Sequence, residues 1–63
     1  MQICYWSRER GELRREKVDR APVAGEIVTL PDLGLVGQVV QCDTGTAPDG
    51  TEELLVELAV AAA

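Results

Sequence analysis

Two short apolar runs with a turn between them constrain the fold of this chain more than any other feature. The runs are Glu26–Leu30 and Leu35–Cys42, both rich in β-branched side chains, and Pro31, Asp32 and Gly34 separate them. β-branched residues favour strands, and Pro, Asp and Gly between two such runs indicate a turn. The pattern therefore predicts a strand, a turn and a second strand at the centre of a small β-barrel.

The length and composition of the chain allow one small domain. It has 63 residues, and 46% of them are hydrophobic, which is enough for a single compact core. Moderate charge and few Pro and Gly residues are typical of a folded chain. We therefore expect residues 1–63 to form one domain.

The N-terminal third is predicted to form a β-hairpin. Met1–Trp6 has the composition of a strand. Residues 7–20 are rich in Arg, Glu and Lys, which also suit a helix, but their two large apolar residues do not share a helical stripe. A turn at Arg8–Gly11, followed by a return strand at residues 12–18, explains the segment better, because opposite charges then pair across the strands.

The C-terminal stretch also has two interpretations. Residues 51–63 contain Glu and Ala residues that suit a helix, which Thr51 would cap. As a strand, the same stretch alternates between aliphatic side chains that point inward and Glu side chains that point outward. We favour the strand because the preceding elements are strands, and we expect residues 43–50 to form a loop. The alternation predicts that the core includes Val28, Leu30, Val40, Val56 and Leu58.

Charge is divided along the chain. The net charge is −5, yet all six Lys and Arg residues lie between Arg8 and Arg20, and only acidic residues carry charge after them. Binding to nucleic-acid phosphates needs a net basic face. The sequence therefore argues against nucleic acid as a partner, although the basic segment keeps RNA binding open as an alternative.

The chain has few residues that could carry out catalysis. It has no His, so no Ser/His or Cys/His nucleophile pair can form, and Cys4 and Cys42 cannot complete a zinc site. Asp43-Thr44-Gly45 resembles the Asp-Thr-Gly of aspartic proteases, but those enzymes need two such carboxylates and a longer chain. We expect no enzyme activity, no catalytic or metal-binding residues, no cofactor and no small-molecule substrate.

The sequence pattern predicts neither a secretory signal nor a membrane span. The N-terminus lacks a basic region followed by a long apolar stretch, and no apolar run approaches the roughly 18–20 residues that cross a bilayer. The two cysteines are then expected to be reduced thiols, and a Cys4–Cys42 disulfide would form only if their strands pair. We expect a cytoplasmic protein that does not contact a membrane.

A glycine-bounded pattern in the centre resembles a known barrel type. Gly25–Leu30 is followed by a turn that contains Gly34 and then by Gly37–Val40. This succession resembles an SH3-like barrel and, within that class, is similar to the KOW-type pattern. The hairpin before it also resembles uncharacterised small proteins of bacterial and phage genomes. The resemblance implies a mainly β fold, a small SH3-like barrel of four or five antiparallel strands. A β-meander with a C-terminal helix is the alternative.

Three functions remain open. Missing catalytic residues and surplus apolar positions favour a non-catalytic protein-binding module, which the phage resemblance extends to a phage- or mobile-element-encoded protein acting on a host protein. The acidic residues after Arg20 suit an inhibitor that mimics nucleic acid and blocks a nuclease or polymerase. The KOW resemblance implies a degenerate RNA-binding domain, since KOW domains bring basic residues to RNA or to the transcription and translation machinery.

The protein-binding hypothesis names a candidate site. On the strand interpretation, Trp6 lies on the face opposite Ile3 and Tyr5 and is partly exposed; the alternative is that Trp6 closes the end of the core and binds no partner. Exposed Trp and Arg side chains contribute most to binding at protein interfaces. The predicted partner-binding residues are Trp6, Arg8, Arg10, Arg14, Arg15 and Leu55. The same patch could form a homodimer, which would give a small domain more buried surface.

Overall fold

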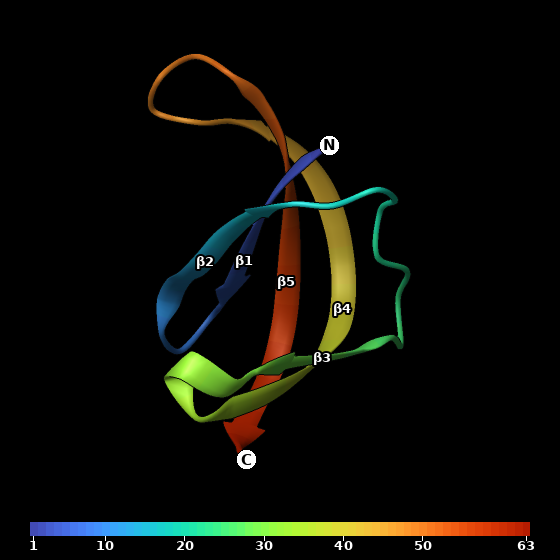
Figure 1. The fold of residues 1–63 in the computed structure, drawn as a ribbon, viewed down its shortest axis with the longest axis vertical. Helices are drawn as coiled ribbons and strands as arrows, with labels where there is room; N and C mark the ends of the chain where they lie inside the picture. The colour runs from blue at the N-terminus through green and yellow to red at the C-terminus, as the bar shows by residue number, and fades with distance from the viewer.

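The protein consists of five strands and one short 3-10 turn (Figure 1). The structure is a computed structural model that describes residues 1–63. Its elements are β1 (Gln2–Ser7), β2 (Gly11–Lys17), β3 (Ile27–Leu30), η1 (Pro31–Leu33), β4 (Leu35–Thr46) and β5 (Glu52–Ala62). The predicted mainly β fold is confirmed. None of its helical segments has the length and apolar character that a membrane crossing requires.

All five strands belong to one curled sheet that forms a half-barrel. The strand order is β2-β1-β5-β4-β3, and neighbours are antiparallel except β1 and β5, which run parallel. Arg14 of β2 binds Asp32 of η1 at 3.1 Å, so the two ends of the sheet approach each other. The half-barrel fits an SH3-like barrel loosely. The expected antiparallel arrangement holds for every strand pair except β1 and β5. These two strands are not joined by a hairpin turn, so their pairing does not have to be antiparallel.

The N-terminal hairpin forms as predicted, so the helical alternative for residues 7–20 is wrong. β1 pairs with β2, and Tyr5 lies opposite Arg14. Between Tyr5 and Trp6 the register shifts, which leaves Leu13 as an extra residue in β2. This β-bulge allows Leu13 to pack against the core although the rest of β2 is strongly polar.

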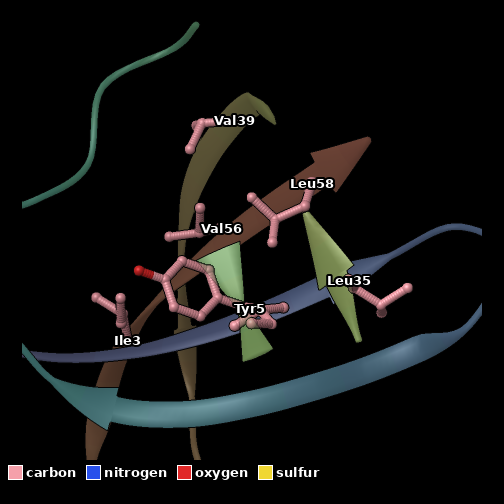
Figure 2. Packing of buried hydrophobic residues seen from close by; sticks show 7 residues of the cluster. Ile3, Tyr5, Leu35, Val39, Val56 and Leu58 are labelled. Carbon is pink, nitrogen blue, oxygen red and sulfur yellow. The ribbon is translucent and has the colours of Figure 1, made fainter. Parts of the chain in front are cut away.

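The core lies on the inner face of the half-barrel, where side chains from four strands converge (Figure 2). Its buried hydrophobic cluster consists of Ile3, Tyr5, Leu30, Leu35, Val39, Val56 and Leu58. The prediction of a buried position is confirmed for Leu30, Val56 and Leu58, and Val28 is partly buried against the same cluster.

The predicted burial of Val40 is wrong, since this residue is 50% exposed. Leu35 and Val39 are buried in the core, and side chains alternate along a strand, so Val40 points outward. Val40 is also the extra residue of a bulge in β4, because Val39 and Gln41 pair with consecutive residues of β5. The alternation counted from Leu35 assigns Val40 correctly to the outer face.

β4 continues beyond the predicted strand. The sequence predicts a loop for residues 43–50, but residues 43–46 pair with residues 52–55 of β5. The turn is therefore shorter, and the Ala47 amide closes it by donating to the Thr51 carbonyl at 2.7 Å. Asp, Thr and Gly suit turns, yet here the partner strand decides the conformation. The predicted C-terminal strand is confirmed at residues 52–62, and the alternative helix is wrong.

Candidate functional site

The outer face of the sheet carries a second layer of covered side chains over β1 and β5. Trp6 lies opposite Glu57 in the ladder between these strands, and Cys4 lies opposite Leu55. All four residues alternate with core residues, so they point away from the core. Cys4 and Glu57 are buried, and Trp6 and Leu55 are half-buried. Long neighbouring side chains therefore cover a face that would otherwise meet solvent.

Glu53 is buried on this face and is held by an arginine and an amide. Its side chain is 2% exposed. Arg15 donates from Nε to Glu53 Oε2 at 3.1 Å and from Nη2 to Oε1 at 3.3 Å, and Gln2 Nε2 donates to Oε2 at 3.1 Å. These donors, Arg15 first, hold the pKa of Glu53 below its ordinary value, and the same contact raises the pKa of Arg15. Glu53 is therefore an ionised carboxylate in a two-point ion pair.

Glu57 has a similar setting farther along β5. Its side chain is 6% exposed. Arg8 Nε donates to Glu57 Oε2 at 2.8 Å, and Gln41 Nε2 donates to Oε1 at 2.9 Å. The Arg8 side chain is 75% exposed, so the remaining N–H groups of its guanidinium face solvent. The Nε side of the Arg8 guanidinium is thus fixed by Glu57, and its other N–H groups are free to bind a partner.

The two cysteines lie on opposite faces of the sheet. Cys4 is buried in the outer layer, and burial raises the pKa of its thiol. Cys42 lies opposite Val56, on the inner face; the residue is exposed, but its thiol donates to the Pro22 carbonyl at 3.4 Å, and partial loss of solvent around the thiol raises its pKa. Since β5 separates the two strands, the cysteines cannot form a disulfide, and both are free thiols. A raised pKa keeps a thiol protonated and unreactive near neutral pH.

Leu55 lies against the backbone of β4. A Cβ atom added at Gly45 would lie 2.8 Å from Leu55 Cδ1, so the absence of a side chain at Gly45 creates the space that Leu55 occupies. Leu55 is consequently half-buried instead of projecting freely. The centre of the outer face is therefore apolar and packed, with a carboxylate on each side of it along β5.

The structure brings four of the six predicted site residues together on the outer face. They are Trp6, Arg8, Arg15 and Leu55. Arg14 lies opposite Tyr5, so it belongs to the inner side and not to the outer face. Arg10 lies in the turn, where only its backbone is held, because its amide donates to Ser7 Oγ at 3.0 Å.

Sequence reasoning missed the two carboxylates that organise this face. The alternation in residues 51–63 predicts that Glu53 and Glu57 point into solvent; they do lie on the outward side of β5, yet both are buried. Their partners come from β1, β2, β4 and the first turn, far away in sequence. The available signal is that Glu53, Leu55 and Glu57 share one face in a chain whose arginines all lie in its first third.

The buried polar groups of this chain satisfy one another. No buried side-chain nitrogen or oxygen lacks a hydrogen-bond partner, and no three Cys, Asp or Glu side chains lie close enough together to hold a metal ion. Comparison with known proteins supplies no relative. No protein-family model, no curated protein and no solved structure matches this chain. The function is therefore argued from the geometry of the outer face.

Proposed function

We propose that the protein is a non-catalytic protein-binding module that docks a partner on its outer face around Trp6. One observation supports the proposal above all: a half-buried Trp lies beside an arginine that a buried carboxylate holds in place. Trp6 lies opposite Glu57 in the β1–β5 ladder, and Glu57 binds Arg8, so the two side chains occupy neighbouring positions. Trp and Arg are among the residues that contribute most to binding energy at interfaces.

Arg8 suits an acidic group of the partner. Its Nε is held by Glu57, and the rest of its guanidinium is exposed. A side chain that is already ordered loses less entropy when it binds, and a guanidinium fork matches the geometry of a carboxylate. The expected partner surface therefore presents a carboxylate next to an apolar group that covers Trp6.

Ion pairing within the chain disfavours the two alternative functions. Four of the six basic residues bind carboxylates, namely Arg8, Arg14, Arg15 and Arg20. A KOW-like RNA-binding domain needs a net basic surface, and each of these pairs cancels one positive charge, Arg8 included, even though part of its guanidinium is exposed. The same ion pairs neutralise four of the seven acids that a nucleic-acid mimic would display, and the acids without an arginine are Asp43, Asp49 and Glu52.

The sequence resemblances extend the proposal. The KOW-like pattern of the central hairpin and the resemblance of the first hairpin to small phage proteins support a phage- or mobile-element-encoded module. Such a module would act on a host protein in the cytoplasm. The expected surface on that host protein is the one described above, a carboxylate next to an apolar group that covers Trp6.

Capture of the partner with matched variants tests the proposal. Immobilised wild-type protein, Trp6→Ala, Arg8→Ala and Val23→Ala are exposed to lysate of the source cells, and the captured proteins are identified by mass spectrometry. Val23 is the control, because it is an apolar loop residue that is 61% exposed outside the outer layer. We expect one protein to bind wild type and Val23→Ala equally, and to bind Trp6→Ala about tenfold more weakly or worse.

Two further measurements complete the test. Circular dichroism verifies that each variant is folded, and quenching of Trp6 fluorescence by acrylamide should decrease when the purified partner is added. A partner that binds Trp6→Ala as tightly as wild type would place the binding site elsewhere. Capture of RNA, or of a basic nuclease, with a steep dependence on salt would support the alternative functions instead.

A further inference from the structure

The C-terminal half of β5 has an unpaired edge. β5 pairs with β4 over its whole length, but its ladder with β1 ends where Trp6 lies opposite Glu57. No strand lies on that side of residues 58–62, and Figure 1 shows β5 continuing past the end of β1. A pocket of about 170 Å³ opens beside this edge, lined mainly by Ser7–Glu9 and Glu57–Val60.

The hydrogen-bond pattern identifies the backbone groups on this edge. The Ala63 amide donates to the Gly34 carbonyl at 2.9 Å, so these residues form a hydrogen-bonded pair that continues the antiparallel β4–β5 ladder. Such pairs alternate along a ladder, so Leu58, Val60 and Ala62 direct their backbone groups away from β4. The Leu58 carbonyl, both groups of Val60 and the Ala62 amide therefore face the side that no strand covers.

The other open edges of the sheet are protected. β2 consists largely of charged residues, and β3 has only four residues. The edge of β4 beyond β3 carries Asp43, and the Cys42 thiol there bonds to the loop at Pro22. Natural proteins use charges, short strands and covering loops to prevent edge strands from pairing with other chains. Residues 58–62, Leu-Ala-Val-Ala-Ala, carry no charge and no Pro, and the turn at Ser7–Glu9 reaches only their beginning, across the pocket.

We infer that this edge pairs with the same edge of a second copy of the chain. In an antiparallel pair centred on Val60, the Val60 amide of each copy donates to the Val60 carbonyl of the other. The Ala62 amide of each copy then reaches the Leu58 carbonyl of the other. Every one of the free groups identified above gains a partner, which is the self-complementarity that a two-fold axis requires. The two five-stranded sheets become one continuous sheet.

The charge of the chain leaves this edge as the place where two copies can meet. The chain carries a net charge of −5, so like charges oppose the approach of two copies over most of its surface. Residues 58–62 carry no charge, and their outward side chains, Ala59 and Ala61, are small and exposed. In the paired edge Ala59 of one copy lies opposite Ala61 of the other, where like charges would be destabilising and none are present.

Sedimentation at several protein concentrations, with edge variants, tests this dimer. Ala62→Pro removes one free amide from an exposed position, and edge strands tolerate Pro where the amide has no partner. The double variant Ala59→Glu with Ala61→Glu places like charges opposite each other across the axis, and a matched double variant carries Lys at both positions. Trp6→Ala is the control for the outer-face site.

The expected results are specific to the edge. Wild type and Trp6→Ala should form a dimer whose population rises with concentration, whereas Ala62→Pro and the double Glu variant should sediment as monomers with unchanged dichroism spectra. Mixing the double Glu and double Lys variants should restore a dimer that neither forms alone. A wild-type protein that stays monomeric up to millimolar concentration would overturn the inference. A dimer that persists in both edge variants would overturn it as well, and loss of the dimer in Trp6→Ala alone would assign it to the outer face.

Discussion

Val56 and Glu57 are neighbours in β5 and are covered almost equally, yet their surroundings differ completely. Val56 is 0% exposed and lies in the aliphatic cluster of the inner face. Glu57 is 5% exposed and lies in the outer layer between the side chains of Arg8 and Gln41. The inner face is buried because apolar surface leaves water, whereas the outer face is buried because long polar side chains fold over it.

The comparison explains why this small sheet can bury both of its faces near β5. A carboxylate can be covered only when charge and hydrogen bonds compensate for lost water, and Arg8 and Arg15 supply both. The inner face depends on shape, and the outer face depends on paired charge. The two faces should therefore respond differently to truncation, to added volume and to pH.

Truncation of a core valine should have the largest effect. Val56→Ala should lower the free energy of unfolding by about 2–4 kcal/mol, because it leaves a cavity among residues that are already close-packed. Val40→Ala is the matched control, since Val40 is 50% exposed on the outer face, and its effect should stay within about 0.5 kcal/mol. Urea unfolding of both variants measures the difference. Equal losses of unfolding free energy in the two variants would show that the inner face does not depend on close packing more than the outer face does.

Alkaline pH should weaken the inner face. Burial, followed by the Glu16 carboxylate, raises the pKa of Tyr5 from its ordinary value near 10 to about 12. A raised pKa means that the folded state holds the phenol proton more tightly, so this contribution is complete below pH 10 and is lost as the pH rises from about 10 to 12. The shift corresponds to roughly 2–3 kcal/mol.

Tyr5→Phe is the control for this effect. Cys4 and Cys42 also have raised pKa values, but they are common to both proteins and cancel in the difference. The unfolding free energy of wild type should fall faster than that of Tyr5→Phe between pH 10 and pH 12. Tyrosinate absorbance of the folded protein, which has a single Tyr, should appear only near the upper end of this range. Parallel pH profiles would contradict the prediction.

Added volume should separate the faces by a smaller amount. A Cβ atom at Gly37 would lie 3.1 Å from Leu58 Cβ and 3.3 Å from Val60 Cγ1, so Gly37→Ala crowds the core and should cost about 1–3 kcal/mol. At Gly45 an added Cβ would lie 2.8 Å from Leu55 Cδ1 and 2.9 Å from Leu55 Cγ, so the Leu55 side chain would have to leave its position. Because Leu55 is only half-buried and can turn toward solvent, Gly45→Ala should cost less than Gly37→Ala, and melting curves of the two variants should show this difference. A larger loss for Gly45→Ala would mean that Leu55 is held as rigidly as the core.

The sequence predicts the inner face better than the outer face. The strand at residues 52–62 follows from alternation, and the first hairpin follows from strand composition and the pairing of opposite charges; both depend on nearby residues alone. The length of β4 does not follow, because Asp43–Thr46 becomes a strand only through its pairing with β5. The parallel contact of β1 with β5 joins the two ends of the chain, and no local pattern encodes it.

The candidate site could be predicted only in part. Trp6, Arg8 and Arg15 are suggested by residue type, but nothing in their spacing separates Arg15 from Arg14. The register of the first hairpin makes that separation, since Arg14 lies opposite Tyr5 and Arg15 lies opposite Cys4. Likewise, the burial of the outer carboxylates depends on partners from other strands, and composition alone assigns them to solvent.

Acid should weaken the outer face, and we expect this effect to be the smallest of the four. The pKa of Glu53 is held below its ordinary value, first by Arg15 and then by Gln2. The folded state therefore binds this proton less readily than the unfolded state, and the stability that Glu53 contributes is complete above about pH 5 and is lost as the pH falls through its folded pKa.

The pKa of Asp49 is also lowered, chiefly by the Thr51 backbone amide, and would act in the same pH range. Glu53→Gln leaves Asp49 intact, so the difference between wild type and this variant isolates the ion pair with Arg15. Wild type should be more stable than Glu53→Gln at neutral pH. The difference in unfolding free energy should shrink toward acid, because a protonated Glu53 is neutral, as Gln is. Because the Arg15 side chain is 34% exposed, salt should also reduce the difference at neutral pH. A difference that does not change with pH would mean that the Glu53 side chain stabilises the outer face through its shape rather than its charge, and the contrast between the two faces would then disappear at this position.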